Sequence, residues 1–195
     1  MALVSSESLI NDAIAGKVVS FPTDTLPALG VKPENSQSIF QIKRRSYKKP
    51  LILMVGTIAD IWQYVTGSPE ELKIWQDMAN RHLPGALTMV LPASKKIPAT
   101  MNPLNPHSIG VRVPNNSVAR SILQKTGGLA TTSANLSGEF ALTKMSAIAN
   151  KFPTVSVLGY QEESNSGVAS TVIKWQDNQW QVLRQGQVDI ENEQK

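Results

Sequence analysis

Four residues in two separate stretches of the chain have side chains that suit a phosphate group. Lys43 and Arg45 are two residues apart in the basic run KRRSYKK, so both cations can approach one anion near the end of a helix. Ser133 and Asn135 close the run TTSAN and supply a hydroxyl and an amide for directional hydrogen bonds. Nucleotidyl transfer depends mainly on charge and donors placed around the phosphates, so we predict that these four residues form one phosphate-binding site. We expect the cluster to be solvated, so that replacing Lys43 or Arg45 leaves the fold intact.

Two further stretches carry polar side chains next to apolar segments. Residues 22–30 (PTDTLPALG) follow a short strand, and the ends of strands are where α/β sheets gather ligand groups; the alternative is a plain polar turn. Arg112 lies inside the apolar strand IGVRVP, where an arginine rarely lacks a partner. Its guanidinium can clamp a carboxylate through two parallel hydrogen bonds.

Several classes of chemistry are excluded by what the sequence lacks. The chain has no cysteine, which excludes disulfides, thiolate zinc sites, iron–sulfur clusters and cysteine nucleophiles. Because His82 and His107 are its two histidines, we expect no metal site built from protein side chains. The glycine-rich phosphate patterns GxxxxGK[ST] and GxGxxG and the hydrolase pattern GxSxG are absent as well.

Three short motifs together raise the alternative of a penicillin-recognising serine enzyme. Residues 46–49 match SxxK, residues 133–135 match SxN and residues 125–127 match KTG. In those enzymes the KTG motif comes last and lies on a strand. Here it precedes SxN and ends an expected helix, so the context disagrees with this alternative.

The elements that must position these residues alternate between helix-like and strand-like patterns. Helices are expected to begin near Ser6, Ser36 and Ser68, and to cover residues 116–125 and 143–151. Short apolar runs predict strands over residues 17–21, 51–55, 87–91, 109–113, 129–132, 155–158, 171–173 and 180–183. This alternation is typical of an α/β fold, and the late strands without helices between them indicate a mixed sheet with an antiparallel portion.

Length and composition indicate one folded domain. The chain has 195 residues, of which 41% are hydrophobic, and no composition break marks a linker. We therefore expect a single domain over residues 1–195, with a core over about 6–186 and a flexible tail over 187–195. The sequence shows no secretion leader and no membrane-spanning apolar run, so we expect a cytoplasmic protein without a membrane partner.

Positive charge is concentrated in the first two-thirds of the chain. The formal net charge is +4, residues 43–49 hold five of the 19 basic residues, and no acidic residue lies between Asp77 and Glu139. Such a bias suits a polyphosphate ligand or a nucleic-acid backbone such as tRNA or double-stranded RNA, and the alternative is a solvated basic face. RNA binding would weaken steeply with salt, because it releases counterions.

Seven sequence blocks, in this order, resemble the YrdC family, the threonylcarbamoyl-adenylate synthases of tRNA modification. The blocks are PTDTLPALG, KRRSYKKPL, PGALT, IGVRVP, TTSANLSG, ASTVI and LRQG, and together they extend over residues 22–186. No single block is specific, whereas the ordered set is. The length matches the single-domain form of the family.

The resemblance implies a fold, a reaction and a set of site residues. The fold would be a twisted mixed sheet flanked by helices, YrdC/RibB-like, with a deep basic concave cleft. The reaction would join L-threonine, bicarbonate and ATP, accompanied by Mg²⁺, into threonylcarbamoyl-AMP with release of pyrophosphate. A partner machinery would then transfer the threonylcarbamoyl group to tRNA. By motif match, the catalytic residues would be Lys43, Arg45, Ser133 and Asn135. ATP would be bound by these four together with Thr88, Ser170, Thr171 and Arg184. Threonine would be bound by Thr25 and Arg112.

The chain also departs from the family pattern. Pro27 and Ala28 replace a Tyr-Gly pair beside the expected threonine pocket, while Ser46, Ala169 and Gln185 each replace a proline. These changes leave the phosphate residues intact and bear on the identity of the substrate. The competing interpretation is a non-catalytic relative with the same fold that binds RNA or a nucleotide.

Overall fold

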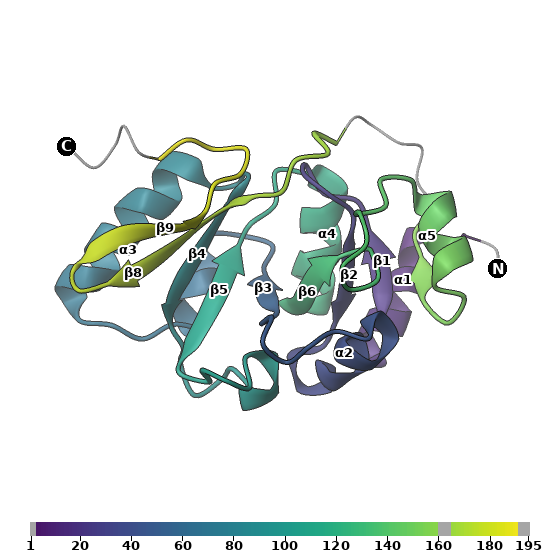
Figure 1. Ribbon diagram of the computed structural model, residues 1–195, viewed down its shortest axis with the longest axis horizontal. Coiled ribbons are helices and arrows are strands. Elements are labelled where there is room, and N and C mark those ends of the chain that lie inside the picture. The colour runs from purple at the N-terminus through teal and green to yellow at the C-terminus, as the bar shows by residue number, and fades with distance from the viewer. Residues whose placement is uncertain (1–2, 160–164, 191–195) are drawn as a thin grey trace.

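One long mixed sheet organises the molecule (Figure 1). In the computed structural model, which describes residues 3–159 and 165–190, nine strands form this sheet in the order β7-β1-β2-β6-β3-β5-β4-β8-β9. The strands are β1 (Val19–Phe21), β2 (Ala28–Val31), β3 (Ile52–Met54), β4 (Leu87–Pro92), β5 (Ser108–Arg112), β6 (Leu129–Ser133), β7 (Ser156–Val157), β8 (Thr171–Gln176) and β9 (Gln179–Arg184). The pairs β1–β7, β3–β5 and β4–β8 are parallel, and the other neighbours are antiparallel. The mixed sheet that the sequence predicts is confirmed.

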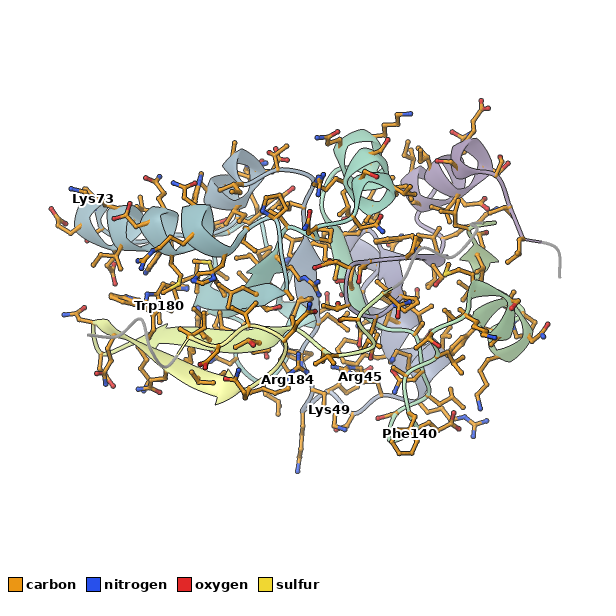
Figure 2. All side chains as sticks on the ribbon, turned by 90° about the horizontal axis from the view of Figure 1, so that it is seen from above. Arg45, Lys49, Lys73, Phe140, Trp180 and Arg184 are labelled. Carbon is orange, nitrogen blue, oxygen red and sulfur yellow. The ribbon has the colours of Figure 1, made fainter. Side chains whose placement is uncertain are left out.

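Helices flank the sheet unevenly. The α-helices of the described residues are α1 (Ser6–Ile14), α2 (Gln37–Lys43), α3 (Pro69–His82), α4 (Ser117–Thr126) and α5 (Met145–Lys151), with short 3-10 helices at Pro33–Asn35, Ala59–Gln63 and Ala99–Met101. Figures 1 and 2 show α1, α3 and α4 along one face of the sheet, while α2 and α5 lie toward its β1 end. Among the described residues, no helix is both long and apolar enough to cross a membrane.

The two faces of the central strands have different roles, because successive residues of a strand point to opposite sides. Leu53, Met89 and Val111 belong to one face and are fully buried in the hydrophobic core. The strand register lines up the residues of the other face across the sheet, for example Met54 with Arg112. This second face forms the floor of a cavity through Ile52, Met54, Thr88, Val90, Gly110, Arg112, Thr131, Ser133, Val172 and Lys174. The sheet thus gathers side chains that are far apart in the chain.

Three sequence expectations need correction. The cap of α1 is Ser5, whose hydroxyl accepts a hydrogen bond from the Ser8 amide at 3.2 Å, and not Ser6. Strand β2 was not predicted, because its four residues follow a proline and resemble a turn more than a strand. The flexible tail expected over residues 187–195 is wrong for residues 187–190, since Ile190 is fully buried and the Gln187 amide donates to the Ala169 carbonyl at 3.1 Å. Residues 191–195 lie outside the described part of the chain.

The predicted start of α3 is confirmed, and it also anchors the helix to the sheet. The Ser68 hydroxyl accepts from the Glu71 amide at 3.2 Å, and the Glu71 carboxylate accepts from the Ser68 amide at 2.9 Å, which is a complete capping box. The other Glu71 oxygen accepts from the Trp175 indole on β8 at 2.9 Å. One side chain therefore joins the helix start to the end strands of the sheet.

Replacing Glu71 with alanine should lower the free energy of unfolding by about 2 kcal/mol, because it removes a cap and leaves the Trp175 indole without its acceptor. Urea denaturation measures the change. Lys73→Ala is the control, since Lys73 is exposed on the same helix and takes no part in the capping box. Equal losses for the two variants would contradict the anchoring role of Glu71.

Candidate active site

A cavity of about 870 Å³ lies over the central strands. Its charged lining, among the described residues, consists of Arg45, Lys48, Lys49, Arg112, Lys174 and Arg184, with Glu139 as the carboxylate. Such an excess of cations attracts anions, because low-dielectric walls focus the positive field. Figure 2 shows Arg45, Lys49 and Arg184 along the same side of the molecule. The basic concave cleft that the resemblance implies is therefore present.

Arg112 forms one wall of the cavity and is only 3% exposed. Its Nη2 donates to Asp24 at 2.7 Å, its Nη1 to the Thr25 hydroxyl at 2.8 Å and its Nε to the Gly85 carbonyl at 3.0 Å. Burial lowers the pKa of Arg112 and the nearby Asp24 carboxylate raises it, while Arg184 lowers it further. The family resemblance placed Thr25 with Arg112 but gave no role to Asp24, the counterion 88 residues away from Arg112 in the chain.

A second group of polar side chains lies on the same side of the cavity. The hydroxyls of Thr88 and Ser170 are 2.9 Å apart, and Arg184 donates to the Ser170 carbonyl at 2.8 Å. A hydroxyl pair uses one of its two protons internally, so one proton stays available to a ligand oxygen. Of the four expected ATP ligands Thr88, Ser170, Thr171 and Arg184, all but Thr171 therefore line the cavity.

Thr171, the fourth of these residues, has a different place. It is fully buried and does not line the cavity. Its hydroxyl accepts from the amides of Gly186 at 3.0 Å and Val188 at 3.1 Å, and it donates to the Val188 carbonyl. Thr171 thus fastens the segment after β9 to the start of β8.

The opposite wall comes from the segment after α2. Arg44 adopts the left-handed conformation (φ 50°), which turns the chain so that Lys43 and Arg45 point in different directions. The Arg45 guanidinium lies against the cavity, where it donates to the carbonyls of Lys49 at 2.9 Å and Pro50 at 3.0 Å. Burial lowers the pKa of Arg45.

Lys43, Ser133 and Asn135 come together as predicted, although not as a solvated cluster. Lys43 is fully buried and is absent from the cavity lining, so the expectation that it belongs to a solvated cluster is wrong. Its ammonium donates to the Ser133 carbonyl and, at 3.1 Å, to the Asn135 side-chain oxygen. The Ser133 hydroxyl donates to the same oxygen at 2.7 Å.

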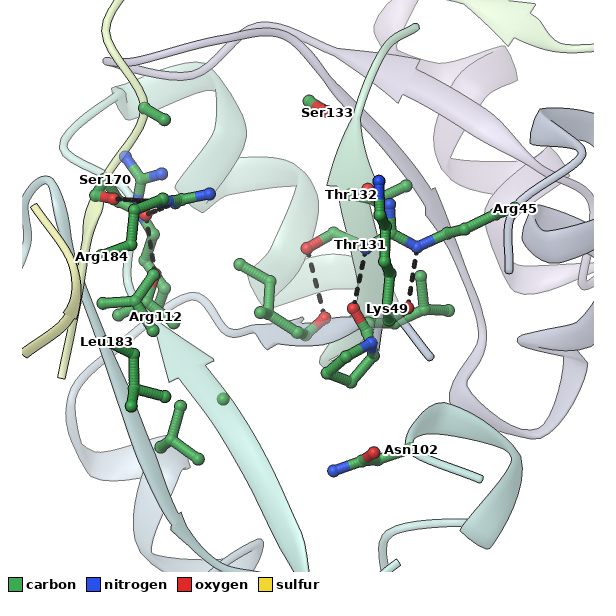
Figure 3. A pocket seen from close by; sticks show the side chains of 18 of the residues that line it. Arg45, Lys49, Asn102, Arg112, Thr131, Thr132, Ser133, Ser170, Leu183 and Arg184 are labelled. Carbon is green, nitrogen blue, oxygen red and sulfur yellow. Dashed lines mark hydrogen bonds between the residues drawn. The ribbon is translucent and has the colours of Figure 1, made fainter. Parts of the chain in front are cut away.

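The cavity therefore has two cationic sides that face each other. Figure 3 shows Arg112, Arg184 and Ser170 on one side and Arg45 and Lys49 on the other. Sequence reasoning missed Asn102, also labelled there, whose amide donates to the Ser108 carbonyl at 3.2 Å. Its segment, MNPLNP, matches no motif that could have marked it. Within the described residues, no group of three or more histidine, aspartate or glutamate side chains could hold a metal ion.

Comparisons with known proteins agree with this architecture. The Sua5/YciO/YrdC family model, described as "Telomere recombination", matches residues 13–186. The chain is 31% identical over 148 residues to a threonylcarbamoyl-AMP synthase of Bos taurus (74% of this chain, 51% of the relative). It is 30% identical over 172 residues to one of Pseudoalteromonas translucida (84% and 90%). It superposes with a TM-score of 0.82 and 28% identity on the crystal structure of P. abyssi Sua5 complexed with L-threonine, covering 98% of this chain and 57% of that one.

The first curated relatives are longer proteins, and the chain spans about half of their length. The match nevertheless covers most of this chain, from before β1 to the residue after Gln185. The resemblance seen in the seven sequence blocks is therefore confirmed, and the chain belongs to the Sua5/YciO/YrdC family.

Proposed function

We propose that this chain forms threonylcarbamoyl-AMP from L-threonine, bicarbonate and ATP, with release of pyrophosphate. The observation that carries the proposal is the cavity with two facing cationic sides, one built on Arg112 and one on Arg45. The chain has relatives named threonylcarbamoyl-AMP synthase, and it superposes on a Sua5 structure complexed with L-threonine.

Arg112 and Thr25 would bind the threonine carboxylate. A guanidinium carries five N–H donors, and Arg112 uses three of them on Asp24, Thr25 and Gly85. The two remaining donors, one on each Nη atom, suit the two oxygens of a carboxylate. Asp24 and Thr25 already hold the guanidinium in one orientation, so the Arg112 side chain loses little conformational entropy when the substrate binds.

The phosphates of ATP would lie between the two cationic sides, within reach of Arg45, Arg184 and the hydroxyl pair of Thr88 and Ser170. Among the described lining residues Glu139 is the one carboxylate, and this donor set does not fit a resident magnesium site. Mg²⁺ would therefore enter as part of the ATP substrate. The protein supplies charge and positioned donors.

The proposed reaction requires no catalytic base from the protein. The threonine amine and bicarbonate form N-carboxythreonine and water. A carbamate oxygen of this anion then attacks the α-phosphorus of ATP, the bond to the β-phosphate oxygen breaks, and pyrophosphate leaves. The product is an activated carbamoyl donor. A transfer machinery acting on tRNA would consume it and release AMP.

The proposal is tested by incubating the protein with MgATP, labelled threonine and bicarbonate, and by measuring pyrophosphate together with the labelled adenylate. Both should appear, and omission of threonine or bicarbonate should abolish them. Tight ATP binding without pyrophosphate release under these conditions would favour the alternative, a nucleotide-binding protein with the same fold.

Replacing Arg45 with alanine should lower pyrophosphate release by about 10²-fold, the scale expected when one preorganised electrostatic contact is lost. Arg44→Ala is the matched control, because Arg44 is the exposed neighbour and does not line the cavity. Steady-state rates at saturating threonine and bicarbonate measure the change. Equal rates for the two variants would remove Arg45 from the site.

A further inference from the structure

We propose that Asn102 selects the base of the nucleotide, and that its side-chain oxygen accepts a hydrogen bond from the exocyclic amine of adenine. The inference deepens the proposed function, and it rests on that function only where it places a nucleotide in this cavity. It assigns the end of the cavity that neither the phosphates nor the threonine carboxylate would occupy.

The end of the cavity around Asn102 differs chemically from the two cationic sides. Figure 3 shows Asn102 apart from Arg112 and Arg184 on one side and from Arg45 on the other. The segment over residues 102–108 contributes no charged side chain to the lining, which it enters through Asn102, Leu104, Asn105 and Ser108. Apolar surface with a few fixed polar groups suits a nucleobase, which is flat, neutral and edged with donors and acceptors.

Strand β5 joins the two ends of the site. Ser108, Gly110 and Arg112 alternate with buried core residues, so they lie on the cavity face of this one strand. The four residues from Ser108 to Arg112 extend about 13 Å, since each residue of a strand adds roughly 3.3 Å. A threonylcarbamoyl adenylate whose carboxylate binds Arg112 can therefore place its base at the Ser108 end, with the carbamoyl group, the phosphate and the ribose between.

The floor between these ends has no side chain at its centre. In the strand register, Gly110 lies between Ile52 on β3 and Val90 on β4. A Cβ atom at Gly110 would lie 2.9 Å from the Ile52 Cγ2 and 3.2 Å from the Thr88 Cγ2, so a larger residue would have to displace its neighbours. The glycine keeps the floor open, and an aromatic base can lie flat over it beside the apolar side chains.

Ser108 fixes the orientation of the Asn102 amide. The Asn102 nitrogen donates to the Ser108 carbonyl at 3.2 Å and to the Ser108 hydroxyl at 3.1 Å, and that hydroxyl donates to the Asn105 carbonyl at 3.4 Å. Because a carbonyl only accepts, turning the amide over would place two acceptors together. Among the described residues, no group donates to the Asn102 side-chain oxygen, which is left as an acceptor at the cavity.

A fixed acceptor distinguishes purines by the group at C6. Adenine carries an amine there, which donates, whereas guanine and hypoxanthine carry a carbonyl oxygen, which only accepts. The adenine amine can pair with the Asn102 oxygen, while a 6-oxo purine would bring two acceptors against each other and leave both unpaired. Asn102 thus favours adenine nucleotides over 6-oxo purine nucleotides.

Calorimetric titrations with ATP and with inosine triphosphate test this assignment apart from any turnover, since Mg²⁺ is present but threonine and bicarbonate are left out. The wild type should bind ATP roughly 10-fold more tightly than inosine triphosphate, and Asn102→Ala should bring this ratio to about 1 by weakening ATP binding. Asn150→Ala is the matched control and should keep the wild-type ratio, because Asn150 is exposed on α5 and does not line the cavity.

A wild-type protein that binds both nucleotides equally, or neither, would overturn the inference, and so would an Asn102→Ala variant that keeps the preference for ATP. If thermal melts show that Asn102→Ala does not fold, Asn102→Ser decides, since its polar side chain is too short to reach the base and it should lose the same preference. A protein that prefers ATP through Asn102 yet releases no pyrophosphate would leave the inference standing while the proposed synthase activity fails.

Discussion

Replacing Arg112 with alanine is expected to lower pyrophosphate release about 10³-fold and the free energy of unfolding by about 3 kcal/mol. The first loss follows because two parallel charge-assisted bonds to the threonine carboxylate disappear. The second follows because the half-buried Asp24 carboxylate, the Thr25 hydroxyl and the Gly85 carbonyl all lose their donor. Pyrophosphate assays and urea denaturation on one preparation measure both quantities.

Asp24→Asn separates the two roles of Arg112. The variant removes the counterion and keeps both the guanidinium and an oxygen acceptor for Nη2 at 2.7 Å. Stability should fall, whereas pyrophosphate release should fall far less than in Arg112→Ala. Arg112→Lys should behave more like the alanine variant, since a lysine ammonium cannot reproduce the planar, fixed set of N–H donors that the guanidinium offers to Asp24, Thr25 and Gly85. If Asp24→Asn and Arg112→Ala lose the same activity, Arg112 acts through the fold and not through the substrate.

Replacing Gly186 with alanine is expected to cost about 3 kcal/mol of unfolding free energy, at the upper end of overpacking effects, and to weaken ATP binding. An added methyl group would lie closer than 3.0 Å to backbone atoms of Ala169 and Ser170, which cannot swing aside as a flexible side chain can. The Gly186 amide also donates to Thr171 at 3.0 Å, which holds the two segments together. Relief of the clash would push the Gly186 and Ser170 backbones apart, and Ser170 lines the cavity.

Gly127→Ala is the control for this prediction. Gly127 has φ +78° and no atom within 4 Å of an added methyl, so it tests backbone strain without a clash. We expect the free energy of unfolding to fall by about 1 kcal/mol because of this backbone strain. ATP affinity should be unchanged, because Gly127 does not line the cavity. Thermal melts and calorimetric ATP titrations measure the pair. Unchanged ATP affinity in folded Gly186→Ala would show that Ser170 does not contribute to nucleotide binding.

Local chemistry made several elements predictable. The Ser68–Glu71 capping box and the proline between its partners mark the start of α3 in the sequence, because all the bonding groups lie within one helical turn. Strands such as β4 and β5 follow from short apolar runs. Strand β2 escaped prediction because its Ala-Leu-Gly core is stabilised by pairing with β1 and β6, which no local pattern records.

The α/β class, the basic character of the cavity and the presence of residue types suited to a phosphate follow from the amino-acid sequence, because they depend on composition, periodicity and ordered motifs. Which of those residues line the cavity follows from the packing of the folded chain. Lys43 and Arg45 are two residues apart, yet the left-handed turn at Arg44 sends one into the interior and the other to the cavity. Arg112, the last residue of β5, and Asp24, in the loop between β1 and β2, meet across 88 residues of the chain, although β2, β6 and β3 lie between β1 and β5 in the sheet. Burial and long-range pairing arise from the packing of elements distant in sequence, so spacing along the chain does not contain them.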